Sequence, residues 1–145
     1  GLMEEHYRTD VPLKPGAAAC LERMKAAGFQ MCVASSTAPA LLDICLRRLG
    51  IRDYFQFLLS CEEVGVGKDH PDVYLEAARR LGGSPDNTLI FEDILVAART
   101  AKQAGFTLGV IYDVNSADDQ EQLKALADRH FTRWDEEALL TWLGV

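Results

Sequence analysis

The sequence has little positive charge, and the charge it has is scattered. Its 145 residues include 15 Lys and Arg against 22 Asp and Glu, which gives a formal net charge of -7. Proteins that bind nucleic acids need clustered basic side chains to displace the counterions of the phosphate backbone. The composition therefore argues against a nucleic-acid partner.

Paired cysteines, a secretion leader and long apolar runs are also missing. Cys20, Cys32, Cys45 and Cys61 stand far apart, with no C-x-x-C pair and no apolar leader before them. No apolar run approaches the length of a membrane span. We therefore expect a cytoplasmic protein with reduced thiols and no membrane partner.

The sequence does contain enough apolar material for one hydrophobic core. Apolar residues make up 48% of the chain, and 145 residues is an ordinary length for a single domain. Internal repeats, low-complexity tracts and linkers are not visible in the sequence. We predict one domain that covers residues 1–145.

Helix signals and strand signals alternate along the chain. Pro15 is suited to open a helix and Gly28 to cap its end, and Thr37 is a plausible N-cap for the next helix. The remaining periodicity predicts further helices over 71–81, 94–104 and 118–128, strands over 29–34, 55–60, 88–91 and 107–112, and a short edge strand with a closing helix in 129–145. This alternation predicts an α/β fold with a parallel sheet covered by helices on both faces.

Polar side chains follow three of the predicted strands. In open parallel sheets, ligands bind beyond the carboxyl ends of the strands, so these positions are candidates for one shared site. The residues are Ser35, Ser36, Thr37, Lys68, Glu92 and Asp93. Hydroxyl and ammonium groups suit a phosphate, and hard carboxylate oxygens suit Mg2+.

Each of these features also has a purely structural explanation. The hydroxyls that follow the strand at 29–34 can be a turn and a helix N-cap. Lys68 can be a solvated loop lysine, and Glu92 and Asp93 can complement the dipole of the helix that follows them. The order of all three features at successive strand ends favours a shared site over three separate coincidences.

The motifs resemble a known family. The segments "PGAAACLERMKAAGFQMCVASSTAPALLDICLRRLGIRDYF", "GKDHPDVYLEAARRLG" and "LIFEDILVAARTAKQAG" are similar to the haloacid dehalogenase superfamily, in its branch of β-phosphoglucomutase-like and phosphoglycolate-phosphatase-like hydrolases. The resemblance runs from about Pro15 to Tyr112. It implies a Rossmann-like three-layer sandwich and a Mg2+-dependent reaction on a small phosphorylated metabolite.

The resemblance also implies roles for particular residues. Ser35 matches the Ser/Thr that binds the transferring phosphoryl group, with Ser36 beside it, and Lys68 matches the lysine that neutralises charge on that group. Glu92 and Asp93 match the acidic motif that holds Mg2+, and Asp93 is the stronger candidate for direct coordination. We therefore expect Ser35 and Lys68 to be catalytic and phosphate-binding, and Asp93 and Glu92 to bind the metal.

One motif of the family is missing from the sequence. Members begin with an apolar strand that ends in D-x-D, whose first Asp is the nucleophile, and a helical cap follows it. Asp10 follows polar residues and does not end such a strand, and Asp113 follows the strand after the acidic motif. We therefore predict that the chain lacks the central first strand and the cap, that a missing segment or a second chain completes the sheet, and that the chain is a fragment that is inactive alone.

Three functions remain open on the sequence. The first is a Mg2+-dependent phosphatase of a small organic phosphate. The second is a sugar-phosphate mutase of the β-phosphoglucomutase type, which would need a cap to reorient its intermediate. The third is a non-catalytic α/β module, or one that a partner chain complements.

Overall fold

A twisted parallel β-sheet forms the centre of the computed structural model, which describes residues 2–5 and 16–145. In this part of the chain the sheet has six strands in the order β3-β2-β1-β4-β5-β6, and every neighbouring pair is parallel. The strands are β1 (Leu2–Glu5), β2 (Gln30–Ser35), β3 (Leu58–Ser60), β4 (Thr88–Glu92), β5 (Thr107–Ile111) and β6 (Arg129–Phe131). The predicted parallel sheet is confirmed.

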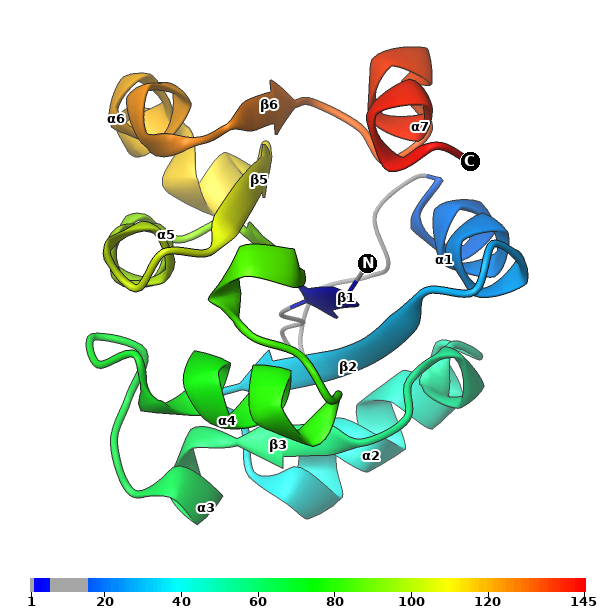
Figure 1. Ribbon diagram of the computed structural model, residues 1–145, viewed down its shortest axis with the longest axis vertical. Helices are drawn as coiled ribbons and strands as arrows, with labels where there is room; N and C mark the ends of the chain where they lie inside the picture. The colour runs from blue at the N-terminus through cyan, green and yellow to red at the C-terminus, as the bar shows by residue number, and fades with distance from the viewer. Residues whose placement is uncertain (1, 6–15) are drawn as a thin grey trace.

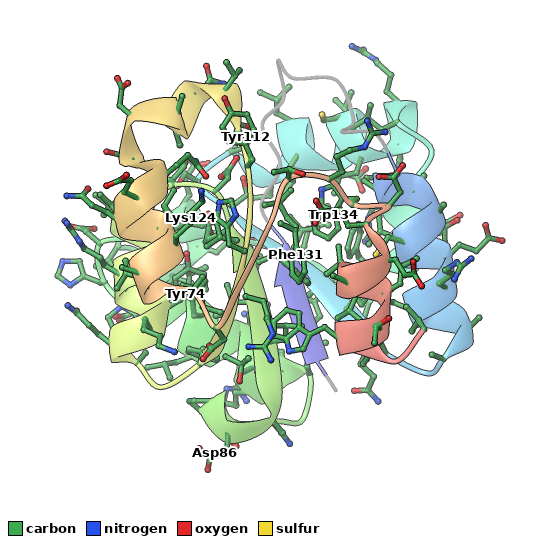
Figure 2. All side chains as sticks on the ribbon, turned by 90° about the horizontal axis from the view of Figure 1, so that it is seen from above. Tyr74, Asp86, Tyr112, Lys124, Phe131 and Trp134 are labelled. Carbon is green, nitrogen blue, oxygen red and sulfur yellow. The ribbon has the colours of Figure 1, made fainter. Side chains whose placement is uncertain are left out.

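Helices cover both faces of this sheet and complete a three-layer sandwich (Figures 1 and 2). They are α1 (Ala17–Ala26), α2 (Pro39–Arg48), α3 (Cys61–Val64), α4 (Asp72–Arg80), α5 (Leu95–Gln103), α6 (Gln120–Leu126) and α7 (Glu137–Leu143). One buried cluster joins the sheet to α4, α5 and α6, and the other joins it to α1, α2 and α7. Successive side chains of a strand point to opposite faces of the sheet. In β4, Ile90 accordingly belongs to the first cluster and Phe91 to the second.

The centre of the sheet corrects one prediction from the sequence. The place between β2 and β4, which we expected to be empty, is occupied by β1, whose residues pair with Gln30–Val33 on one side and with Thr88–Ile90 on the other. No second chain is needed to fill this position. The segment "LMEE" escaped recognition because two of its four residues are glutamates, whereas a central parallel strand ordinarily reads as an apolar run.

Aromatic side chains pack together on the face of the sheet that α1 and α7 cover. The ring of Phe91 lies 4.9 Å from that of Trp134 and 6.2 Å from that of Trp142, and Phe131 lies 5.8 Å from Trp142. The glycine at position 109 makes room for this packing, because a Cβ atom there would lie 2.6 Å from Cε1 of Phe91. Both tryptophans therefore pack in the same core cluster.

A hydrogen-bonded carboxylate ties β5 to the chain that enters β6. Asp128 Oδ2 accepts from the Leu108 N–H at 2.7 Å, and its Oδ1 accepts from Lys102 Nζ at 2.8 Å. Partial burial acts to raise the pKa of Asp128, but these two donors outweigh it and hold the pKa below its ordinary value of 3.8.

This arrangement predicts a contribution to acid unfolding. A carboxyl whose pKa is lowered in the folded state adds stability above its unfolded pKa and loses it as the pH falls through the folded value. We expect Asp128→Asn to flatten the decline in the free energy of unfolding between about pH 6 and about pH 3, measured by urea denaturation. Asp118→Asn, at an exposed position, is the control. An unchanged decline in Asp128→Asn would contradict the assignment.

In the described ranges, no helix is both long enough and apolar enough to cross a membrane.

Candidate functional site

The carboxyl end of β2 carries a buried serine whose hydroxyl organises the turn after the strand. Ser35 is fully buried, and its Oγ accepts from the Thr37 N–H at 3.0 Å. This bond leaves the hydroxyl proton of Ser35 for donation to another group. Ser36 is exposed, and its Oγ lies 3.9 Å from the Sγ of Cys61 at the start of α3.

The same turn is held from the neighbouring strand by Ser60, the last residue of β3. Its Oγ donates to the Thr37 carbonyl at 2.8 Å and accepts from the Glu62 N–H at 3.1 Å. The hydroxyl therefore caps α3 and fixes the turn after β2 at the same time. Sequence reasoning missed this residue because its partner lies 23 positions away.

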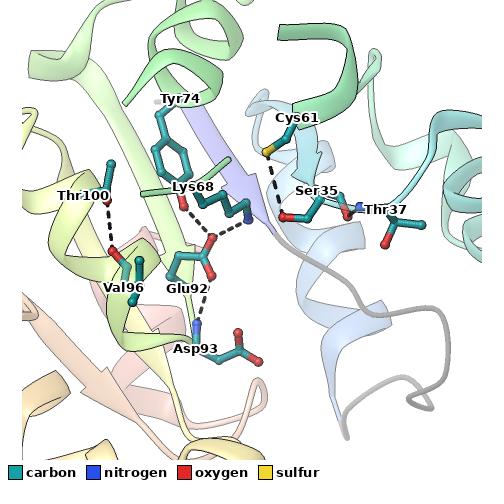
Figure 3. A network of polar contacts seen from close by, with 10 residues as sticks. Ser35, Thr37, Cys61, Lys68, Tyr74, Glu92, Asp93, Val96 and Thr100 are labelled. Atoms are coloured by element: carbon teal, nitrogen blue, oxygen red, sulfur yellow. Dashed lines mark hydrogen bonds and ion pairs between the residues drawn. The ribbon is translucent and has the colours of Figure 1, made fainter. Parts of the chain in front are cut away.

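A buried ion pair joins Lys68 to the end of β4. Lys68 Nζ lies 2.6 Å from Glu92 Oε2, and the two side chains are only 7% and 1% exposed. Lys68 comes from the loop before α4, and Glu92 is the last residue of its strand, so two segments 24 positions apart meet here (Figure 3). Lys68 is therefore a buried, charge-paired lysine and not a solvated loop lysine.

Tyr74 of α4 contacts both members of this pair. Its hydroxyl donates to the same Glu92 Oε2 at 2.8 Å, and Lys68 Nζ lies 5.6 Å from the centre of its ring. The side chain is fully buried. Val73, Tyr74, Ala77 and Ala78 recur at the spacing of one helical face, and a buried phenol needs a hydrogen-bond partner. That signal could have indicated a link to the site.

The parallel sheet places these groups at one edge. Ser35 ends β2 and Glu92 ends β4, with β1 between them. Because parallel strands present their carboxyl ends at the same edge, the two residues lie on one rim, about 10 Å apart at two strand spacings. Figure 3 shows Lys68 on this rim between Glu92 and the turn after β2. The structure thus brings the predicted residues together.

The carboxylates at this rim differ in what they can offer a divalent cation. The backbone N–H of Asp93 donates to Glu92 Oε1 at 3.3 Å, so both oxygens of Glu92 accept hydrogen bonds. Asp93 is only partly buried. Residues 2–5 and 16–145 contain no group of three or more His, Cys, Asp or Glu side chains that could hold a metal. The donor set fits Mg2+ held by one carboxylate together with water and a phosphate, which is a common way for proteins to bind this ion.

Of the two other aspartates considered as nucleophiles, the structure describes Asp113. Asp113 lies beyond the end of β5, where its Oδ1 accepts from the Asn115 N–H at 2.8 Å and caps the short helix Val114–Asp119. That contact is a local turn interaction. Asp10 lies outside the described residues.

Comparisons with known sequences match one family of hydrolases. The sequence model of a family described as haloacid dehalogenase-like hydrolase matches residues 3–105. A phosphorylated carbohydrates phosphatase from Thermotoga maritima is 32% identical over 103 residues, which are 70% of this chain and 48% of the relative. A protein named CbbY from Rhodobacter capsulatus is 35% identical over 98 residues, 66% of this chain and 43% of the relative. The chain thus spans less than half the length of these curated relatives.

Solved structures show the same fold. A hydrolase from Deinococcus radiodurans, described as a member of the HAD family with bound phosphate and sodium, superposes with a TM-score of 0.82 at 30% identity, covering 94% of this chain and 62% of that one. A putative beta-phosphoglucomutase from Thermotoga maritima gives 0.76 at 27% identity, covering 90% and 60%. The phosphatase names and the mutase name both occur among these relatives.

Proposed function

This chain belongs to the haloacid dehalogenase-like hydrolases, and we propose that it forms the phosphoryl-binding core of a Mg2+-dependent phosphatase for a small organic phosphate. The observation that carries the proposal is the pair of Lys68 and Glu92, buried at 2.6 Å on the rim where β2 delivers Ser35. A lysine held at this rim offers positive charge and N–H donors to an anion that binds there. The phosphatase reading has support from the names of curated relatives.

In this proposal the turn after β2 binds the phosphoryl oxygens. Ser35 accepts from the Thr37 N–H, so its own proton is directed to a phosphoryl oxygen. The first turn of α2 contains no acidic residue, and no side chain caps its start. The backbone N–H groups there and the helix dipole favour an anion.

Lys68 neutralises charge on the transferring group from the other side of the rim. Asp93 would hold Mg2+, which supplies electrostatic stabilisation of the phosphoryl oxygens when it is bound. Before an anion binds, Glu92 holds the ammonium of Lys68 at the rim. The sequence contains no D-x-D motif at the end of β1, so we propose that the 145-residue chain binds phosphate but does not supply the nucleophile of the whole protein.

Binding of inorganic phosphate tests this function directly. We expect isothermal titration calorimetry on the 145-residue chain to show saturable binding that Mg2+ strengthens. Ser35→Ala and Lys68→Met should weaken it, and Asp93→Asn should remove the effect of Mg2+. The matched control is Asp86→Asn, because Asp86 is exposed and precedes β4, at the opposite edge of the sheet from Asp93 (Figure 2).

Two outcomes would contradict the proposal in different ways. No saturable binding, or binding that Ser35→Ala and Lys68→Met leave unchanged, would favour a non-catalytic α/β module. Hydrolysis of an aryl phosphate by the 145-residue chain, if Asp93→Asn abolished it, would support a phosphatase but would show that the chain has its own nucleophile.

A further inference from the structure

We propose that Tyr74 is a positioning residue that keeps Glu92 in place when Lys68 turns towards a bound phosphoryl group. The inference rests on the proposed function, because it concerns what happens at the site when an anion arrives. It assigns a role to a side chain that belongs to the buried face of α4 and that does not touch the phosphoryl group.

The geometry brings two donors to one oxygen atom. Lys68 Nζ lies 2.6 Å from Glu92 Oε2, and the Tyr74 hydroxyl donates to the same atom at 2.8 Å. The two donors differ in how they are held. The phenol is fully buried and is fixed by the packing of α4 against the sheet, whereas the ammonium sits at the end of a flexible stem.

An anion on the rim creates a competition for Lys68. The ammonium has three protons and no acceptor, so it can serve Glu92 and a phosphoryl oxygen together only by dividing its donors. Each step that Lys68 takes towards the phosphoryl group leaves the 1% exposed Glu92 carboxylate with less compensation. A buried carboxylate without compensation is costly, and that cost opposes phosphate binding.

Tyr74 reduces this cost. Its hydrogen bond to Glu92 Oε2 does not depend on where the ammonium points, so the carboxylate keeps a strong donor while Lys68 moves. The ring also lies 5.6 Å from Lys68 Nζ and offers a favourable face to the cation. The phenol therefore makes Lys68 available to the ligand while Glu92 keeps its hydrogen bonds from Tyr74 and from the Asp93 N–H.

The first arm of the test measures the affinity for inorganic phosphate by calorimetry. Tyr74→Phe keeps the ring and removes the hydroxyl, and we expect it to weaken phosphate binding about tenfold, the effect of a lost hydrogen bond to a charged group. In the Glu92→Gln background the same substitution should leave the affinity unchanged, because no charge remains to be compensated. A role in packing alone would not depend on the charge at position 92.

The matched control is Tyr54→Phe. Tyr54 also lies beside a lysine, with Lys25 Nζ 5.9 Å from its ring centre, but it belongs to the 3-10 turn Arg52–Tyr54 and packs against the cluster under α1 and α2. We expect it to leave phosphate affinity unchanged.

The second arm needs no phosphate and separates this inference from the proposed function. If the hydrogen bond from Tyr74 stabilises the Glu92 carboxylate in the absence of the lysine, Lys68→Met should lower the urea midpoint more in the Tyr74→Phe background than in the wild type. Additive shifts would overturn the inference, and so would equal phosphate affinities of the wild type and Tyr74→Phe. If the urea midpoints show coupling but the wild type binds no phosphate, the link between Tyr74 and Glu92 is supported and the phosphate site is rejected.

Discussion

Replacing Lys68 by methionine is expected to lower kcat/KM for a small phosphate ester by ~100-fold or more in the catalytically complete protein, about 3 kcal/mol of transition-state stabilisation. The side chain is 7% exposed and its ammonium is held 2.6 Å from Glu92 Oε2. A positive charge fixed in a site with little water stabilises developing charge far better than a solvated one. Methionine keeps an unbranched apolar stem of similar length and removes the charge together with its N–H donors.

The control for this substitution is Lys124→Met, because Lys124 is exposed on α6, a helix that packs against α5, β5 and β6 (Figure 2). Steady-state kinetics should show no loss for the control. In the 145-residue chain the same pair of variants can be compared by phosphate affinity. If Lys68→Met retained full kcat/KM, Lys68 would be a structural residue and the role assigned to it would be wrong.

Removing the other member of the pair is expected to have a large effect on stability. Glu92→Leu leaves the ammonium of Lys68 buried without its carboxylate partner, and breaking a buried ion pair from one side costs about 3–5 kcal/mol. Urea denaturation of the variant should show this loss in the free energy of unfolding. Adding Lys68→Met should restore most of it, because two apolar side chains of similar volume can replace such a pair at little cost.

The double variant then separates the two uses of the pair. We expect it to regain most of the stability lost in Glu92→Leu, short of the wild type by about 1–3 kcal/mol because the buried Tyr74 hydroxyl has lost this acceptor. It should bind inorganic phosphate no better than Lys68→Met alone. If the two substitutions were additive in stability, the pair would not be coupled, and the contact of 2.6 Å would have no energetic consequence. A stable double variant that still bound phosphate would place the anion elsewhere.

Much of the fold could be predicted because its signals are local. The run at 29–34 and the strand observed at Gln30–Ser35 agree, and Pro39–Arg48 falls inside the helix expected between Thr37 and Gly50. These elements have apolar periodicity that can be recognised without the rest of the chain. The N-cap expected at Thr37 is wrong, because Ala38 occupies that position and no side chain caps the start of α2. The position of the site at one edge of the sheet could be predicted from these strands, because parallel strands have their carboxyl ends at the same edge.

The missed features depend on contacts between distant residues. β1 has no apolar run, and its place follows only from pairing with β2 and β4, residues 30–33 and 88–90. The hydroxyl of Tyr74 meets a carboxylate 18 positions away, and a buried position on a helix does not by itself identify the partner. The roles of Ser35, Lys68 and Asp93 remain predictions that the proposed experiments test.

The two tryptophans of the sequence make one face of the sheet visible to fluorescence. Trp134 and Trp142 both lie against Phe91, on the side that α1 and α7 cover, whereas Tyr74 lies in the cluster on the other side. Tryptophan emission therefore reports on the face of the sheet that α1 and α7 cover. The opposite face, which carries Tyr74, contains no tryptophan among the described residues. Phe91 precedes Glu92 in β4, so a shift of this strand on ligand binding would pass directly to the indole rings and give an intrinsic optical signal.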